Sequence, residues 1–444
     1  GVQVVNDAIL DFLPVSSTSW RSTALVDSRT LGFDHVTITN PIGALELEVD
    51  PETQLWKMTQ PIAARADLFV VNSLIQMLRT ARVEGFVTDD PTAAFEPFGL
   101  DAPSSSLVLG RAGAPVFGIK FGRNSTNQPE QVFAQLQSRS NIVVVAAGLL
   151  DMLRRPHTTY RDHSLVTVSP AAVDRVEIRT RERVVLERDP GKPWRIVEPF
   201  AAAADPEAVR SLFESVNRLR IVEFTKDIVD NFAPYGLDTP DRQYSFFSRG
   251  NSQVSTNTLL ARIDFSGNQI AGSRVDTVFA RCEGESSVYT VPYGDTLQLP
   301  RAAYELRDKQ LWSFDTADVV RCIVEHGGTT NVWDRTDEGV WTGDLVLNAS
   351  MEEVMHRVGN LRVVSWKAKG RGSLALYGVG AASARMILEL KNGETPRVLE
   401  FGRESGRGPY VAVTLEDVEP VIFVFPNELA AFLKRDFFPS VKPE

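Results

Sequence analysis

Two acidic residues recur at corresponding places in this sequence and are its first candidates for chemistry. Asp67 and Asp205 each follow an alanine and precede a segment with helical spacing of apolar residues, and Ser350 takes the third corresponding place. Two carboxylates across one cleft would suit a hydrolase of the glycosidase type. Asp and Ser also accept hydrogen bonds from the free N–H groups at a helix start. Because Pro206 suits the first helical position and Ser350 with Glu353 matches a capping box, we expect helix caps at all three places.

A turn with the pattern Gly-Leu-Asp-x-Pro supplies a second pair of acids. Its glycines, acids and prolines are Gly99, Asp101, Pro103, Gly236, Asp238 and Pro240. The third occurrence keeps Gly378 but has Gly380 in place of the acid, so a site that needs all three acids is not expected. In such turns Gly adopts a positive φ, Asp bonds its own backbone and Pro fixes the exit. We therefore interpret these residues as structural.

Three tryptophans could bind a ligand by their aromatic faces. Trp56, Trp194 and Trp341 lie at nearly equal distances after the start of three similar segments, and Pro61 and Pro199 follow the first two. Exposed and coplanar, the three side chains would form a face for a glycan. A tryptophan at the same place in each copy of a repeat more often fills the core, because it buries a large apolar area. We expect core positions for all three.

The remaining reactive residues show no pattern of a known site. The five histidines lack an H-E-x-x-H or other paired ligand spacing, and no G-x-S-x-G or S-x-x-K nucleophile motif is present. Cys282 and Cys322 could form one disulfide or stay free, because their spacing does not decide between the two. Residues 161–162 and 307–308, both Arg-Asp, are expected to form ion pairs at module junctions. We predict no catalytic, metal-binding or cofactor-binding residues.

The residues described above recur because the sequence contains three diverged copies of one module. Each copy opens with alternating apolar and polar residues, passes through the tryptophan into an amphipathic helix, and continues after the turn with strand-like runs and a short helix. The expected order is two strands, a long helix, four strands and a short helix. Strands in runs favour antiparallel pairing with helices on one face. We predict an α+β fold of three tandem modules, each a mostly antiparallel sheet with one long and one short helix.

The copies divide the chain into a lead-in at residues 1–32 and modules at 33–170, 171–318 and 319–444, the last being the most diverged. No Pro-rich or Gly/Ser-rich linker separates the modules, so we expect them to pack against one another. The composition, with 43% hydrophobic and 23% charged residues, is that of a folded protein. A net charge of -10 without a basic stripe argues against binding to nucleic acid or to an anionic membrane surface.

The tryptophan and proline strand, the Ala-Asp helix start and the Gly-Leu-Asp-x-Pro turn resemble a bacterial repeat family, the domain of unknown function 4340. The matching residues are Trp56, Pro61, Ala66, Asp67 and 99–103 in the first copy, and Trp194, Pro199, Ala204, Asp205 and 236–240 in the second. The resemblance covers nearly the whole chain after residue 32 and is weakest in the third copy. It implies an extracytoplasmic protein on the periplasmic side, anchored by one N-terminal helix and encoded beside ABC transporters of the gliding-motility-associated type.

The family has no established catalytic residues, so the resemblance assigns none here. The chain begins at Gly1 rather than Met, and we expect that the anchor helix was trimmed away. Together these features predict a non-catalytic scaffold or binding protein, an accessory of an ABC-type transport or gliding-related system. Its expected partner is a protein at a membrane, with ABC transporter components among the candidates, and a polymer or glycan ligand is compatible with stacked modules. The alternatives are a polymer-acting hydrolase with paired carboxylates and a carbohydrate- or lipid-binding module.

Overall fold

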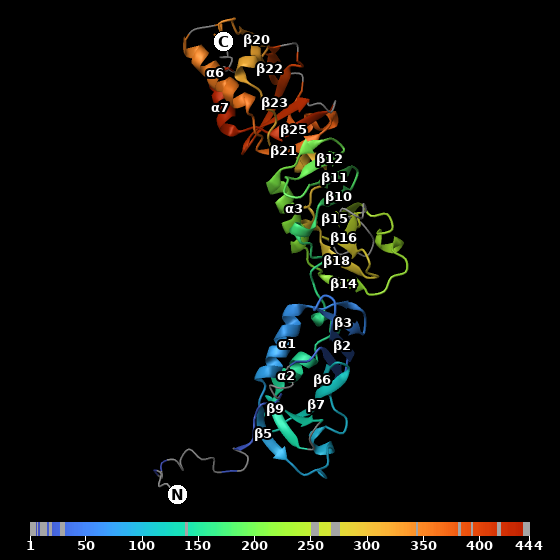
Figure 1. Cartoon of the computed structure of the whole chain (residues 1–444). Coiled ribbons are helices and arrows are strands. Elements are labelled where there is room, and N and C mark those ends of the chain that lie inside the picture. The colour runs from blue at the N-terminus through green and yellow to red at the C-terminus, as the bar shows by residue number, and fades with distance from the viewer. Residues whose placement is uncertain are drawn as a thin grey trace. The chain divides into compact units, whose positions relative to one another are not determined.

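An antiparallel sheet that carries its helices on one face is the unit of this fold, and it occurs three times (Figure 1). The computed structural model describes residues 6, 8, 16, 20–26, 32–137, 141–249, 257–267, 276–342, 345–380, 383–391, 394–414 and 419–437. The chain divides into two compact units, Gly1–His163 and Ser164–Glu444. The first unit contains the first sheet, which we call module 1, and the second contains modules 2 and 3.

Module 1 is built on a sheet whose nine described strands follow the order β4-β3-β2-β1-β6-β7-β8-β9-β5, with each neighbouring pair antiparallel. The strands are β1 (His35–Asn40), β2 (Gly43–Val49), β3 (Trp56–Gln60), β4 (Ala64–Arg65), β5 (Val83–Thr88), β6 (Ser105–Arg111), β7 (Ala114–Asn124), β8 (Gln131–Leu136) and β9 (Ile142–Ala146). The long helix α1 (Leu68–Thr80) lies between β4 and β5 in the chain, and the short helix α2 (Ala147–Leu153) follows β9.

Module 2 repeats this topology strand for strand, with the order β13-β12-β11-β10-β15-β16-β17-β18-β14 in the part that the structure describes. The strands are β10 (Arg175–Arg179), β11 (Arg183–Glu187), β12 (Arg195–Glu198), β13 (Ala202–Ala203), β14 (Glu223–Lys226), β15 (Arg242–Ser248), β16 (Thr258–Phe265), β17 (Thr277–Cys282) and β18 (Val288–Pro292). The long helix is α3 (Pro206–Arg218), and two short helices, α4 (Tyr293–Thr296) and α5 (Ala303–Leu306), take the place of one.

Module 3 keeps seven described strands in the order β20-β19-β22-β23-β24-β25-β21. They are β19 (Val319–His326), β20 (Thr329–Asp334), β21 (Ser365–Lys369), β22 (Ala384–Leu390), β23 (Arg397–Ser405), β24 (Gly408–Thr414) and β25 (Pro420–Val424). The helices are α6 (Leu345–Gly359) and α7 (Asn427–Asp436). Where modules 1 and 2 have two further edge strands, module 3 has an isolated bridge between Arg335 and Trp341. The predicted α+β fold of three antiparallel modules is confirmed.

The predicted order of elements was incomplete. In modules 1 and 2, four strands rather than two precede the long helix, and five rather than four follow it. The strand β4 contains only Ala64–Arg65, and β13 only Ala202–Ala203. A strand of two residues cannot show an alternating pattern, so its place in the sheet depends on pairing with the neighbouring strand.

The segment before each first strand packs into the module that follows it. Leu25, Leu165 and Leu311 are buried in the cores of modules 1, 2 and 3 respectively. Each also donates a backbone hydrogen bond to a carbonyl at the end of the long helix: Leu25 to Ala81, at 3.1 Å, and the other two to Leu219 and Leu361. The predicted boundaries near residues 32, 170 and 318 therefore fall inside the following module, because these segments lack strand periodicity but still bury apolar side chains.

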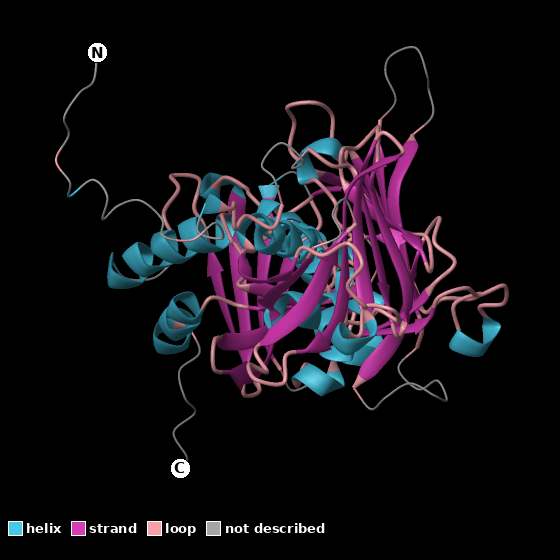
Figure 2. Ribbon diagram, turned by 90° about the horizontal axis from the view of Figure 1, so that it is seen from below, coloured by secondary structure: helices cyan, strands magenta, loops and turns pink. Residues whose placement is uncertain are grey.

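Alternating burial along the strands fixes which face of each sheet carries the helices. In β8 every second residue, Val132, Ala134 and Leu136, is buried. The helix α1 buries Val71, Leu74 and Leu78 in the same hydrophobic core of module 1. Figure 2 shows helices next to the strands. Burial of each such side chain stabilises the fold by about 1.5–3 kcal/mol, so tertiary packing holds α1 on the sheet.

Two buried tyrosines make the stability of modules 1 and 2 sensitive to high pH. The Tyr160 hydroxyl donates to the Met152 carbonyl at 2.8 Å, and the Tyr244 hydroxyl donates to Pro300 at 3.0 Å. Burial raises the pKa of both tyrosines to about 12, from an ordinary value of 10.0. The unfolded chain therefore loses these protons first as the pH rises from 10, and stability falls by roughly 2 kcal/mol per tyrosine up to pH 12.

Spectrophotometric titration of tyrosinate, with thermal unfolding at each pH, measures this effect. Tyr160→Phe should flatten the pH dependence of module 1 and leave that of module 2 unchanged. If both tyrosines ionised near their ordinary pKa in the folded protein, the expectation would be wrong.

Candidate functional site

The recurring acids Asp67 and Asp205 cap helices, as predicted. An Asp67 carboxylate oxygen accepts hydrogen bonds from the N–H groups of Phe69 and Val70, at 2.9 and 3.1 Å, at the start of α1. The Asp205 carboxylate accepts from the Glu207 N–H at 3.0 Å, at the start of α3. Both carboxylates accept hydrogen bonds from backbone N–H groups of the helix that they precede, and this capping role accounts for their recurrence.

The prediction for Ser350 was wrong. Ser350 lies inside α6, which begins at Leu345, and Glu353 pairs with Arg357 one turn later, at 2.6 Å, instead of reaching back to the serine. The residues before Ser350 are Leu-Val-Leu-Asn-Ala. Leucine and alanine favour the helix, so the helix extends past the serine towards the N-terminus.

We expect Asp67→Ala to lower the free energy of unfolding of module 1 by about 1 kcal/mol, because the cap is lost. Asp205→Ala should cost about 2 kcal/mol, because Asp205 also pairs with Lys309 at 3.1 Å with its side chain only 8% exposed. Ser350→Ala is the control and should be neutral or slightly stabilising, since alanine is the better residue inside a helix. Denaturant unfolding followed by hydrogen exchange resolves the modules, and equal losses for Asp67→Ala and Ser350→Ala would contradict the assignment.

The three tryptophans all pack in cores, but to different depths. Trp341 is 1% exposed, and its indole N–H donates to a Glu352 carboxylate oxygen at 3.1 Å. Trp56 and Trp194 are half-buried at the edges of the cores of modules 1 and 2. The ring of Trp56 lies 6.2 Å from that of Phe33. Each tryptophan thus serves its own module, and their recurrence reflects the repeated core.

The recurring turn has the predicted backbone. Gly99, Gly236 and Gly378 have φ values of 67°, 65° and 74° and end short 3₁₀ segments. A residue with a side chain rarely adopts this left-handed conformation. Asp238 accepts a hydrogen bond from the neighbouring Thr239 N–H at 2.9 Å, whereas Asp101 is exposed. Pro103 and Pro240 follow these turns, and the peptide bonds before Pro61 and Pro199 are cis.

Neither Cys282 nor Cys322 forms a disulfide and both are buried, so the disulfide alternative is wrong. Cys282 lies in the core of module 2 and Cys322 in that of module 3. Burial raises the pKa of the Cys322 thiol to about 12, which leaves it unreactive at neutral pH. Within the described ranges, no three His, Cys, Asp or Glu side chains gather as metal ligands would. No helix in those ranges is both long and apolar enough to cross a membrane.

Polar and aromatic side chains connect modules 2 and 3 at their junction. The Arg307 guanidinium carbon lies 5.5 Å from the ring centroid of Phe200 in module 2 and 5.6 Å from that of Trp366 in module 3. The Trp366 indole N–H also donates to the Arg307 carbonyl at 3.1 Å. Lys309 adds its ion pair with Asp205. The short helix α5 of module 2 contacts the strand β21, which carries Trp366.

The Arg-Asp pairs that end modules 1 and 2 do lie at module ends, but the ion pairs connect them to other elements. Asp162 pairs with Arg65 of β4 at 2.9 Å. Asp308 approaches Arg362 at 3.7 Å, while Arg307 stacks between two aromatic rings. Adjacent residues on an extended chain point to opposite sides, so the Arg and Asp of one dipeptide find different partners.

A pocket of about 1110 Å³ opens beside this junction. Its aromatic and cationic walls include Phe200, Trp312, Arg307, Arg385 and Arg397. The two acids that line it are already paired, Glu400 with Arg385 at 3.1 Å and Glu394 with Arg397 at 3.4 Å. Each acid in the lining thus already has an arginine as its partner. The pocket therefore has the chemistry of a binding site.

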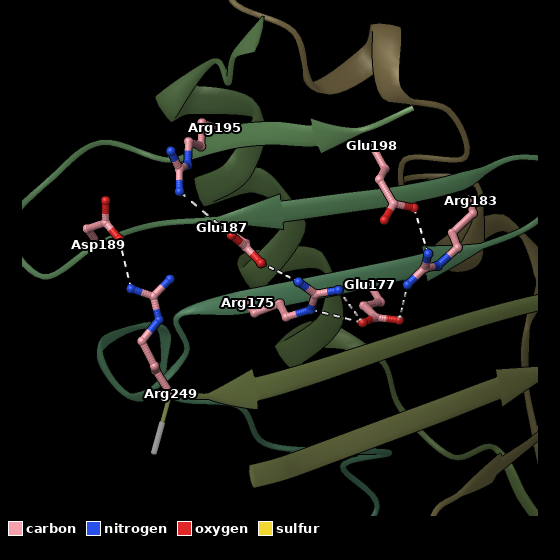
Figure 3. Close-up of polar contacts among 8 residues, drawn as sticks. All are labelled: Arg175, Glu177, Arg183, Glu187, Asp189, Arg195, Glu198 and Arg249. Carbon is pink, nitrogen blue, oxygen red and sulfur yellow. Dashed lines mark hydrogen bonds and ion pairs between the residues drawn. The ribbon is translucent and has the colours of Figure 1, made fainter. Parts of the chain in front are cut away.

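The face of the sheet opposite the helices carries a lattice of ion pairs in module 2 (Figure 3). Arg175 bonds both Glu177, at 2.7 Å, and Glu187 on the neighbouring strand. Arg183 bonds Glu198 at 2.7 Å and approaches Glu177 at 3.5 Å. Burial raises the pKa of Glu177, but the hydrogen bonds and charges of Arg175 and Arg183 outweigh it and hold that pKa below its ordinary value.

The same place on the first strand recurs in module 3, where Arg321 pairs with Asp334 at 2.6 Å and Glu389 at 3.4 Å. In module 1 the corresponding His35 stands opposite Glu48. The sequence analysis did not predict these charged pairs on the first strand of each module. Their only signal was a basic residue at the third position of each strand-like run, and the acidic partners come from strands that only the pairing register brings opposite.

Comparison with curated proteins found no similar sequence. The sequence profile of the family described as Domain of unknown function (DUF4340) matches residues 56–193 and 194–371. Each match begins at a repeated tryptophan, Trp56 or Trp194, so the profile starts at the third strand of the sheet rather than at its first. Because the two matches together cover more than half of the chain, this protein belongs to the Domain of unknown function (DUF4340) family.

Proposed function

We propose that this protein is a non-catalytic scaffold or binding protein that works outside the cytoplasm, anchored at a membrane, as an accessory of an ABC-type transport or gliding-related system. The observation that carries the binding role is the junction of modules 2 and 3. Its aromatic and arginine side chains, Phe200, Arg307 and Trp366, connect two modules within one compact unit. The setting at a membrane and the transport system rest on the sequence resemblance described above.

The junction pocket suits a segment of a protein partner. Trp312, Phe200 and arginines line it together, and tryptophan, tyrosine and arginine dominate the binding energy of protein interfaces. Arg385 and Arg397 each have a paired acid, so the rim offers both signs of charge. A protein segment with mixed charges and an apolar anchor complements such a lining better than a polyanion does.

Co-purification from membranes of the source organism tests this proposal. The full-length anchored protein should enrich components of a transport system, and Arg397→Glu should reduce their recovery at least tenfold. Arg357→Glu is the matched control, because Arg357 makes a similar exposed pair with Glu353 on α6, away from the junction pocket. Clean recovery of an unrelated protein, or equal recovery with both variants, would contradict the proposal.

A further inference from the structure

We propose that two copies of this protein associate through the face of the module 3 sheet that lies opposite its helices. Four apolar side chains form one row across that face, on β20, β19, β22 and β23. Val332 and Ile387 both stand opposite Ile323, and Val398 stands opposite Ile387. Val332 is 49% exposed, and the other three are half-buried. A contiguous apolar row on an open sheet face is typical of an interaction surface.

Neither of the other modules carries this apolar row. The place of Ile323 on the first strand holds Glu177 in module 2 and Thr37 in module 1. The place of Ile387, on the strand beside it, holds Ser245 in module 2. The shared fold therefore does not require apolar residues here, and the row is a property of module 3.

Four charged side chains surround the middle of the row. Arg321 and Glu325 lie on β19, and opposite them on β22 lie Glu389 and Arg385 respectively. Arg321 pairs with Glu389 at 3.4 Å, and Arg385 pairs with Glu325 at 3.5 Å. The four side chains are 36–44% exposed, so they are accessible to a second molecule. They form a square in which like charges lie at diagonal corners.

A square of this kind is complementary to a copy of itself. Under a twofold axis along the apolar row, Arg321 of one copy comes over Glu325 of the other, and Arg385 comes over Glu389 in the same way. Under a twofold axis along the strands, Arg321 comes over Glu389 instead. In both arrangements each arginine meets a carboxylate while the two apolar rows pack together, as a symmetric dimer requires. This match of charges favours a second copy over a partner of one charge.

The size of the face predicts a weak dimer. Neighbouring strands lie about 4.8 Å apart and alternate residues of a strand about 6.8 Å apart, so four strands and three rows span roughly 20 Å in each direction. Such a patch buries less than the roughly 800 Å² per partner of a standard stable interface. The row ends at Val398, which also lines the junction pocket, but the dimer does not depend on what that pocket binds.

Sedimentation equilibrium of the full chain over a range of concentrations tests this proposal. The chain should be monomeric when dilute and form dimers as the concentration rises. Ile387→Ser, which introduces the residue of module 2, should weaken the dimer about tenfold, because it removes an apolar contact at the centre. Arg321→Glu should have a similar effect, because it places like charges opposite each other on the two copies.

Val108→Ser is the matched control, because Val108 stands opposite Thr37 in module 1 as Ile387 stands opposite Ile323 in module 3. It should leave the association unchanged. Thermal unfolding shows whether each variant is folded, and if Ile387→Ser is not, the exposed Arg321→Glu decides alone.

The proposal is overturned if the chain remains monomeric at every concentration, or if the dimer is as stable in Ile387→Ser and Arg321→Glu as in the unmodified protein. It is also overturned if the chain is monomeric and Ile387→Ser instead lowers the recovery of transport components in the co-purification. The face would then bind a different protein rather than a second copy.

Discussion

Replacing Gly122 with alanine is expected to destabilise module 1 by about 3 kcal/mol. A Cβ atom added at Gly122 would overlap the carbonyl oxygen of Phe98, in the turn that ends at Gly99. Backbone cannot move aside as a flexible side chain can, so the turn would have to leave β7. Gly402 in module 3 is in the same position, because its added Cβ would overlap the Tyr377 carbonyl oxygen.

Urea denaturation of the full chain, read through hydrogen exchange of the β6 and β7 amides, measures this loss for module 1 alone. Gly148→Ala is the control, because an added Cβ there meets nothing within 4 Å and Gly148 lies in α2. That change should be neutral or stabilising by up to about 1 kcal/mol. Module 2 has Ser266 at the position of Gly122, so the expected loss applies to modules 1 and 3. A loss below about 0.5 kcal/mol for Gly122→Ala would show that the turn is not held against β7.

Trp341→Ala is expected to destabilise module 3 by about 3–5 kcal/mol. The indole is completely enclosed, and its removal leaves a cavity and takes away the N–H that donates to Glu352. Trp56→Ala in module 1 should cost less, about 2 kcal/mol, because Trp56 is half-buried and solvent can fill part of the space.

The same hydrogen-exchange measurement, on α6 for Trp341→Ala and on α1 for Trp56→Ala, compares the two recurring tryptophans directly. A conservative Trp341→Phe should recover part of the loss, because it restores apolar volume but not the hydrogen bond to Glu352. Equal losses of stability for Trp341→Ala and Trp56→Ala would mean that depth of burial does not decide how much each tryptophan stabilises its module.

Local chemistry made the caps and turns predictable. Asp67 and Asp205 cap helices because a short carboxylate reaches the free N–H groups of its own helix, and Gly99, Gly236 and Gly378 adopt positive φ because only glycine does so without strain. The prediction failed at Ser350, where the same residue preference exists but the preceding residues also favour the helix. These helix caps and glycine turns could be assigned correctly without knowing which side chains are buried or which strands pair.

Features that depend on contacts between distant residues were not predictable. The lattice around Arg175 requires the register that brings Glu187 opposite it, and a register shift of one residue would place these side chains on the other face. The junction pocket and the stacking of Arg307 between Phe200 and Trp366 join segments more than 150 residues apart.

The sequence by itself determined that this protein is a threefold repeat of an α+β module, because hydrophobic periodicity, helix caps and glycine turns act over a few residues and recur with the copy. Only the tertiary structure decided where the modules begin and how modules 2 and 3 are joined. These properties depend on which side chains from distant strands and helices fill the same volume.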